Sequence, residues 1–303
     1  MEKALVTVAI PAYKADFLYE SISSVLNQTY ENLELLIVND RSPQDIEAVV
    51  RRFSDSRIRY YVNERNIGGE NPANNWNRCL EHARGEFFAL ICDDDVYAPD
   101  FIENMISLAD RYPACNVFRA RAHIVDGRGK HVENYPSSPE WESVYDYMWH
   151  VFKGFRKQTI SEFMYRTEHL RNCGGYALLP LAWHADYLSI YRIALDGGIA
   201  TAPSDRFLLS FRQSGRNISS QDSRNTYEKL LATRLYVDEV KSICHEFSED
   251  QKDSILQILG MYVWNHNKWF LRKARFITLV RLLPSCKELG LKPIQVIKSM
   301  FRH

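Results

Sequence analysis

The first 110 residues alternate strand-length apolar runs with amphipathic helical segments, and this alternation limits the available folds more than any other feature. The apolar runs lie at 5–10, 33–38, 58–62 and 87–92, and helical patterns separate them at 18–26, 46–53 and 72–83. Strands that alternate with helices pair in parallel, because each helix carries the chain back across the sheet. The sequence therefore predicts a doubly wound α/β sheet that binds ligands beyond the carboxyl ends of its strands.

Polar and acidic residues follow three of the predicted strands. Pro11, which we expect to end the first strand, is followed by Tyr13. The second strand leads to Asp40, and the fourth to Asp93-Asp94-Asp95. Carboxylates this close repel one another, and each raises the pKa of its neighbours. A bound Mn²⁺ or Mg²⁺ would relieve the repulsion and leave coordination positions for phosphate. A solvated acidic turn is the other interpretation of the triplet.

The charge balance bears on partners and location. The formal net charge of the 303 residues is zero, so no overall field favours nucleic acid as a partner. Residues 261–303 nevertheless carry nine Lys and Arg residues against Glu288 alone, a net charge of +8. The six cysteines show no metal-ligand spacing, and the apolar run at 4–11 lacks a signal-peptide cleavage site. We expect a cytoplasmic protein with reduced thiols and no membrane span.

Several ordered blocks of the sequence resemble the family 2 glycosyltransferases, which are inverting enzymes of the GT-A fold. These blocks are Val8 to Tyr13, Ser24 to Tyr30, Glu34 to Ser42, Asn66 to Gly68, Ala83 to Glu86, and the acidic triplet through Pro99-Asp100. The resemblance implies a Rossmann-like nucleotide-diphospho-sugar transferase with a mixed sheet flanked by helices. It places this domain at 1–220, with a nucleotide-sugar half at 1–115 and an acceptor half at 116–220. A helical C-terminal extension at 221–303 follows.

The resemblance assigns donor-binding roles to individual residues. Pro11 and Tyr13 would border the nucleobase, and Tyr13 would stack on it. Asp40 would hydrogen-bond the base edge, which in this family is commonly uracil. Asn66 and Gly68 fit the loop beside the nucleoside. Capping of the following helix is the other interpretation of Asp40.

Metal and phosphate roles follow from the same resemblance. Asp94 corresponds to the metal ligand of the family, and Asp95 is either a second ligand or a support. Asp93 suits the ribose hydroxyls or the surroundings of the metal. Arg212 and Arg216 could neutralise the departing diphosphate, because guanidinium binds phosphate bidentately; decoration of a surface loop is the other interpretation.

An inverting transfer also needs a base that takes the proton from the acceptor hydroxyl. The family places this acid after a glycine-containing loop, and here Gly174-Gly175 leads to Asp186. The resemblance thus makes Asp186 the candidate base. Ala185 stands where a paired acid is expected. Capping of the helix that follows is the other interpretation of Asp186, and Asp196 and Asp205 are competing candidates for the base.

Together these residues predict a metal-dependent inverting glycosyltransferase that uses a nucleotide-diphosphate sugar, with a UDP-sugar as the first choice. The expected acceptor is a saccharide or lipid-linked saccharide in surface polysaccharide synthesis. The basic aromatic stretch at 261–303 suits peripheral contact with an anionic membrane. Packing on the core or assembly into a homo-oligomer are its other interpretations. A non-catalytic sugar-nucleotide-binding protein and a sugar nucleotidyltransferase are the rival functions.

Overall fold

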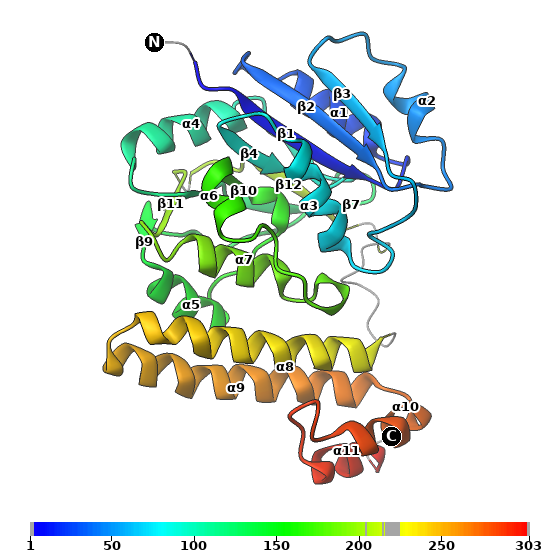
Figure 1. Ribbon diagram of the computed structural model, residues 1–303, viewed down its shortest axis with the longest axis vertical. Coiled ribbons are helices and arrows are strands. Elements are labelled where there is room, and N and C mark those ends of the chain that lie inside the picture. The colour runs from blue at the N-terminus through cyan, green and yellow to red at the C-terminus, as the bar shows by residue number, and fades with distance from the viewer. Residues whose placement is uncertain (1–2, 204, 214, 216–224, 302–303) are drawn as a thin grey trace.

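A mixed sheet lies at the centre of the computed structural model, which describes residues 3–203, 205–213, 215 and 225–301 (Figure 1). Its strand order is β3-β2-β1-β4-β10-β6-β11-β9. In chain order these strands are β1 (Val6–Ala12), β2 (Leu33–Asn39), β3 (Ile58–Val62), β4 (Phe87–Leu90), β6 (Val117–Arg119), β9 (Trp141–Glu142), β10 (Phe163–Arg166) and β11 (Ile199–Thr201). The strands β3, β2, β1 and β4 are parallel, whereas β10 pairs antiparallel with both β4 and β6. The observed sheet is therefore mixed, as predicted.

Helices cover both faces of this sheet. They are α1 (Leu18–Leu26), α2 (Ile46–Val50), α3 (Pro72–His82), α4 (Phe101–Arg111), α5 (Val144–Phe152), α6 (Thr167–Asn172) and α7 (Ala185–Ile193). Alternate residues of a strand point to opposite faces, and β1 shows the consequence. Val8 and Ile10 pack with α1 and α4, whereas Ala9 packs in the cluster that holds α3, α5 and α7. Burial on both faces explains why the strands read as continuous apolar runs.

We expected Pro11 to end the first strand, and this was wrong. Pro11 lies inside β1, opposite Val38. The pairing of β1 with β4 stops earlier, where the Ile91 amide bonds the Ala9 carbonyl at 2.9 Å. Odd-numbered residues of β1 face β4, so Pro11 lies where that ladder has already ended. Its missing N–H therefore removes no hydrogen bond from the sheet.

A second, smaller sheet has the order β5-β12-β7-β8. Its strands are β5 (Val96–Tyr97), β7 (Ala122–Asp126), β8 (His131–Asn134) and β12 (Leu209–Gln213). The strand β5 follows the acidic triplet directly and pairs with β12. The triplet is thereby held between the two sheets.

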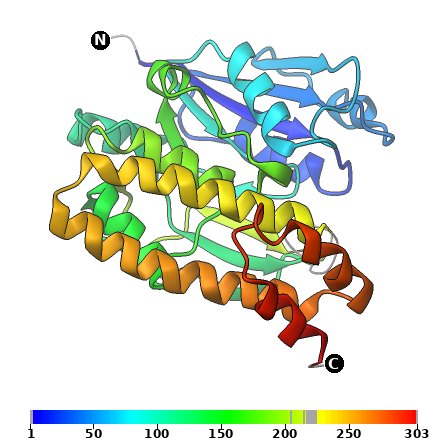
Figure 2. The ribbon, with the colours of Figure 1, turned by 60° about the horizontal axis from the view of Figure 1, so that its bottom comes forward.

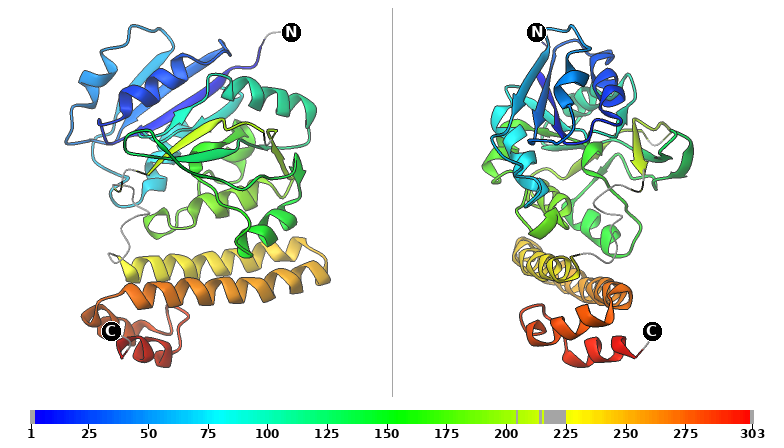
Figure 3. Two further views of the ribbon diagram at one scale, coloured as in Figure 1. Left: turned by 180° about the vertical axis from the view of Figure 1, so that it is seen from behind. Right: turned by 90° about the vertical axis from the view of Figure 1, so that its right-hand side faces the viewer.

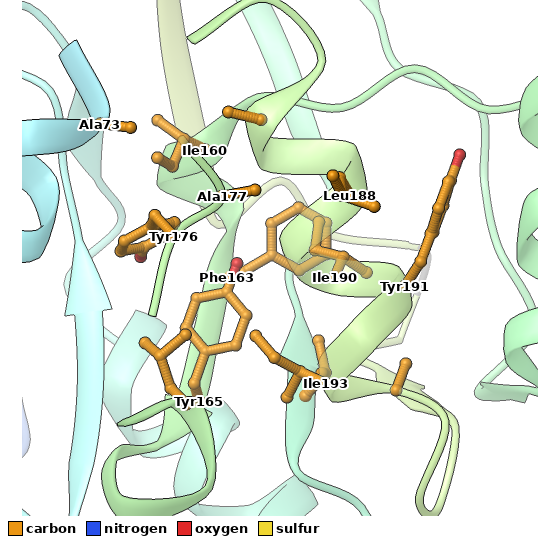
Figure 4. Close-up of a cluster of buried hydrophobic side chains, with 14 of the residues drawn as sticks. Ala73, Ile160, Phe163, Tyr165, Tyr176, Ala177, Leu188, Ile190, Tyr191 and Ile193 are labelled. Carbon is orange, nitrogen blue, oxygen red and sulfur yellow. The ribbon is translucent and has the colours of Figure 1, made fainter. Parts of the chain in front are cut away.

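An aromatic cluster fixes α7 against the main sheet. Phe163 and Tyr165 of β10 lie between Tyr176 and the inner face of α7, where Leu188 and Tyr191 are buried (Figure 4). Aromatic side chains bury large areas and have few rotatable bonds. The element that carries Asp186 in its first turn is therefore rigidly placed.

The C-terminal region is helical, as predicted. It contains α8 (Thr226–Ile243), α9 (Glu249–Lys273), α10 (Phe276–Leu282) and α11 (Pro293–Met300). The helices α8 and α9 form an antiparallel pair that packs under α5 and α7, and α10 and α11 lie at one end of this pair (Figures 2 and 3). Among the described residues no helix is long and apolar enough to cross a membrane. All six cysteines are free thiols.

Candidate active site

The three acids of the triplet make different contacts. The Asp93 carboxylate accepts hydrogen bonds from the backbone N–H groups of Tyr13 and Lys14, at 2.8 and 2.7 Å. The carboxylate of Asp95 is fully buried, and it accepts from Ser161 Oγ at 2.6 Å and from the Arg212 amide at 3.0 Å. These bonds tie Asp93 to the end of β1, and Asp95 to Ser161 and to β12.

The carboxylate of Asp94 is left to interact with cations. Lys14 Nζ lies 3.3 Å from Asp94 Oδ2, and the Asp94 side chain is only 5% exposed. Within the described part of the chain, Lys14 is the one side chain paired with this carboxylate. No motif pointed to Lys14, although it is the first cation after β1.

Burial makes the triplet a poor place for unpaired negative charge. Burial raises the pKa of Asp93 to about 6, although Lys14 opposes the shift. Burial, together with the neighbouring Asp94, raises the pKa of Asp95 to about 8. Burial lowers the pKa of Lys14, but the attraction of Asp93 and Asp94 outweighs it and the net shift is upward. The site therefore favours a cation beside Asp94.

The residues fit a divalent ion. Donor atoms of Cys92, Asp94 and Asp95 all lie within 4.8 Å of one another. A Mg²⁺ ion with ligands at about 2.1 Å spans about 4.2 Å, so movements of less than about 1 Å would close this group around it. Burial raises the pKa of the Cys92 thiol well above its usual value, so the two carboxylates are the stronger ligands. Cys92 was not among the predicted ligands.

The predicted nucleoside loop is built around Asp40. Asp40 Oδ1 accepts from Asn63 Nδ2 at 2.8 Å and from the Ile67 amide at 2.9 Å, while Oδ2 accepts from the Gly68 amide at 2.6 Å. Asn66 Oδ1 accepts from the Gly69 amide at 2.6 Å and tightens the same turn. The carboxylate has about four acceptor positions, so one remains for a ligand.

The end of β1 lies beside this loop in the sheet order. Pro11 is paired with β2, and the exposed fraction of Tyr13 is 40%. The Tyr13 carbonyl accepts from Ser42 Oγ at 2.6 Å, which links the ends of β1 and β2. Arg41, where the family usually has glycine, adopts a left-handed conformation with φ +53°. The turn thus keeps a glycine-like backbone, and the Tyr13 ring is accessible for stacking.

Asp186 lies in the first turn of α7 and follows a strained segment. Leu181, Ala182 and His184 all have left-handed φ values, of +57°, +52° and +65°. Non-glycine residues rarely adopt this conformation, and such strain is concentrated at functional sites. Gln158 Nε2 donates to Asp186 Oδ2 at 3.0 Å, and burial raises the pKa of Asp186.

One short segment joins Asp186 to the acidic triplet. Gln158 bonds Asp186, and Ser161, three residues later, bonds Asp95. Three residues span at most about 11 Å of chain, so this segment brings hydrogen-bonding partners of the two carboxylates close together. Burial raises the pKa of Tyr135, and the neighbouring Asp95 and Asp186 carboxylates raise it further, which agrees with this proximity. Neither Gln158 nor Ser161 belongs to a motif that the sequence displays.

A buried ion pair anchors this segment. Arg119 Nε donates to Glu162 Oε1 at 2.7 Å, and both side chains are buried. Arg119 also donates to the Lys157 carbonyl at 2.7 Å. The ends of the segment are therefore fixed to β6, which keeps Gln158 and Ser161 in register with their carboxylate partners.

Arg212 is buried and turned toward the triplet. Its Nε donates to the Asp94 carbonyl at 2.9 Å, and its guanidinium pairs with Glu20 and lies 4.2 Å from the ring centroid of Phe17. The structure thus brings Arg212 to the site through the backbone of Asp94. Arg216 lies outside the described residues.

Residues 7–184, more than half of the chain, match the sequence profile of Glycosyl transferase family 2. This chain belongs to that family. WfgD of Escherichia coli, a UDP-Glc:alpha-D-GlcNAc-diphosphoundecaprenol beta-1,3-glucosyltransferase, is 39% identical over 109 residues, which cover 36% of this chain and 42% of WfgD. An uncharacterized glycosyltransferase of Rickettsia typhi is 35% identical over 108 residues, covering 35% of this chain and 32% of that protein. The match thus spans less than half of the length of these relatives.

Solved structures show the fold. Residues 1–349 of S. aureus TarS, in complex with UDP-GlcNAc, superpose with a TM-score of 0.71 at 16% identity, covering 98% of this chain and 89% of that one. The mannosyltransferase PcManGT of Pyrobaculum calidifontis, in complex with GDP-Man and Mn²⁺, gives a TM-score of 0.56 at 17% identity and covers 99% and 84%. The fold is that of the GT-A glycosyltransferases, as predicted.

Proposed function

We propose that this family 2 glycosyltransferase transfers a sugar, with inversion, from a UDP-sugar to a saccharide carried on a membrane lipid in surface polysaccharide synthesis. The names of two similar proteins support the donor: WfgD is a UDP-Glc transferase, and TarS binds UDP-GlcNAc. The diphosphoundecaprenol in the name of WfgD supports a lipid-linked acceptor. We assign the transfer to residues 1–220 and treat 221–303 as a helical extension.

The nucleoside would bind at the joined ends of β1 and β2. Tyr13 would stack on the base beside Pro11, because an aromatic ring offers a face to any base. The remaining acceptor position of Asp40 suits the N–H of uracil, and the loop of Asn66 and Gly68 would close the other side. Asp93, held by the end of β1, would face the ribose.

Asp94 and Asp95 would hold Mn²⁺ or Mg²⁺. When bound, such an ion neutralises charge on the diphosphate of the donor. We also assign Arg212 and Arg216 to the diphosphate. For Arg212 this role requires the guanidinium to exchange its ion pair with Glu20 for a phosphate oxygen.

Asp186 would act as the base. The acceptor hydroxyl oxygen attacks the anomeric carbon, its proton passes to Asp186, and the bond from that carbon to the diphosphate oxygen breaks to release UDP. The raised pKa of Asp186 brings its basicity closer to neutral pH, where a base is most effective. The observation that carries this proposal is the segment from Gln158 to Ser161, which bonds both Asp186 and Asp95.

Two substitutions test the assignment by sugar transfer from UDP-glucose and UDP-GlcNAc in the presence of Mn²⁺. Asp94→Asn should lose metal-dependent UDP binding and transfer together. Asp186→Asn should keep UDP binding and lose transfer. Asp196→Asn is the matched control, because Asp196 is an exposed acid shortly after α7 and should transfer normally.

The same experiment separates the rival functions. A non-catalytic sugar-nucleotide-binding protein would tolerate the departures from the family pattern at Arg41 and Ala185, and at Cys92, where the commonest family form has an acid. Such a protein binds UDP but transfers no sugar in any variant. A nucleotidyltransferase would instead form a nucleotide sugar from a sugar phosphate and UTP. Normal transfer by Asp94→Asn and Asp186→Asn would refute the site assignment itself.

A further inference from the structure

The helix α10 has two apolar faces, of which only one is buried against the rest of the protein. Leu279 and Leu282 are buried in the C-terminal cluster, whereas Phe276, Ile277 and Val280 are 60%, 55% and 41% exposed. At 100° per residue these three side chains share an arc on the side away from the buried leucines. A solvated helix would carry polar residues on that arc.

The neighbouring helix α11 repeats this arrangement. Val296 is buried, whereas Ile294, Ile297 and Phe301 are 51%, 37% and 83% exposed, at the i, i+3, i+7 spacing of one helical stripe. The helices α10 and α11 pack against each other. We call the six exposed side chains of the two helices the outer apolar face: Phe276, Ile277, Val280, Ile294, Ile297 and Phe301. Six large apolar side chains exposed on two helices that pack together point to an interaction surface.

Positive charge surrounds the outer apolar face. The exposed cations on or beside the two helices are Arg275, Arg281, Lys292 and Lys298. Glu288 is the only acid between residues 261 and 303. A second copy of this chain would bring like charges together, which disfavours self-association through this face. An anionic surface with an apolar interior is complementary both to the cations and to the apolar side chains.

The C-terminal cluster, in which Leu279, Leu282 and Val296 are buried, also contacts the segment before Asp186. Trp183 packs against the C-terminal cluster, with its ring centroid 5.5 Å from that of Phe270, and Lys229 Nζ lies 4.7 Å from the same indole. Trp183 lies in the strained segment, three residues before Asp186. A surface bound to α10 and α11 is thereby connected by direct packing to the segment that carries the candidate base.

We propose that the outer apolar face binds the surface of a bilayer rich in anionic phospholipid, with α10 and α11 lying in the plane of the headgroups. These helices of seven and eight residues are only about 10 to 12 Å long, so they lie on a bilayer rather than span it. The binding rests on this surface and not on sugar transfer. It would bring the active site to an acceptor carried on a membrane lipid.

Vesicle co-sedimentation of the full chain tests the proposal. The protein should bind phosphatidylglycerol-containing vesicles and not phosphatidylcholine vesicles, and salt should weaken the binding. The double substitution Phe276→Ser with Ile294→Ser should reduce the partition coefficient by about tenfold or more, because two apolar side chains no longer enter the interface. Phe155→Ser is the matched control, since Phe155 is 55% exposed but lies outside the C-terminal helices; it should change binding by less than about twofold.

A second variant changes charged side chains instead of apolar ones. It keeps the proposal testable if Phe276→Ser with Ile294→Ser fails to fold. Arg281→Glu with Lys298→Glu should lower binding to anionic vesicles and reduce its salt dependence. Transfer to a water-soluble acceptor should be unchanged in both variants, which separates this proposal from that of sugar transfer. Failure of the wild type to bind anionic vesicles would overturn the proposal, as would wild-type binding by both variants. A wild-type dimer that Phe276→Ser with Ile294→Ser makes monomeric would assign the face to a second copy instead.

Discussion

The substitution Gly68→Ala tests whether the loop around Asp40 holds the donor. A Cβ atom at Gly68 would lie 2.6 Å from Asp40 Oδ2, the oxygen that accepts from the Gly68 amide. An ordinary C···O contact is about 3.3 Å or more, so the carboxylate and the loop must separate by about 0.7 Å. Because Asp40 is only 3% exposed, its carboxylate cannot avoid the new methyl group by rotating into solvent.

The cost follows from this contact. A hydrogen bond to a charged group contributes about 1.5 to 3 kcal/mol, while replacing glycine lowers the entropy of the unfolded chain and returns about 0.4 to 1 kcal/mol. We expect the free energy of unfolding to fall by about 1 to 2 kcal/mol in urea titrations. The dissociation constant of UDP, measured by calorimetry, should rise about tenfold or more, because the loop no longer closes on the nucleoside.

A second glycine provides the control. A Cβ atom at Gly260, inside α9, would meet no atom within 4 Å. Gly260→Ala should therefore leave UDP binding unchanged and increase stability by up to about 1 kcal/mol. If Gly68→Ala unfolded at the wild-type urea concentration and bound UDP with wild-type affinity, the loop around Asp40 would not be the donor site.

Three further predictions concern the carboxylates and Lys14. Asp186→Asn should lower the rate of transfer by about 10² or more while UDP still binds; in the wild type the rate should rise as pH passes upward through the raised pKa of Asp186. Lys14→Met should increase Mn²⁺ affinity by about tenfold in calorimetry, because the ammonium 3.3 Å from Asp94 no longer competes; lower affinity would contradict competition. In metal-free protein the raised pKa values, about 6 for Asp93 and about 8 for Asp95, mean that the native state holds protons that the unfolded state has lost. The free energy of unfolding should therefore fall as pH rises from about 4, where Asp93 and Asp95 begin to ionise in the unfolded chain, to about 8. Asp95→Asn should flatten the upper part of that decline in urea titrations at successive pH values, and an unchanged slope would contradict the raised pKa of Asp95.

Local patterns were enough to predict most of the helices and strands of residues 1–111. The predicted helices at 18–26 and 72–83 agree with α1 and, to within one residue, with α3, because amphipathic spacing and burial agree there. The strand through Pro11 was cut short, because the effect of a proline depends on which neighbour its missing N–H faces. For the C-terminal region only a helical extension was predicted, so α10 was not identified as a separate helix.

The connections within the candidate site could not be read from the sequence. Ser161 bonds Asp95 across 66 residues, and Lys14 pairs with Asp94 across 80. Neither partner has a residue type or a spacing that marks it as functional. The left-handed conformations of Leu181 and His184 could not be predicted from the sequence either. Positive φ values are expected at glycine, and neither residue is a glycine. Such contacts depend on packing between distant elements.

Calorimetric titration of UDP into the full chain, with and without Mn²⁺, tests the central claim most directly. We predict that UDP binds more tightly with Mn²⁺ than without it. In the presence of Mn²⁺, UDP should also bind more tightly than GDP. Asp94→Asn should remove the dependence on the metal, and Asp186→Asn should keep it. UDP binding that is equally tight without Mn²⁺ and unaffected by Asp94→Asn would contradict the assignment of Asp94 as the residue that links metal and donor.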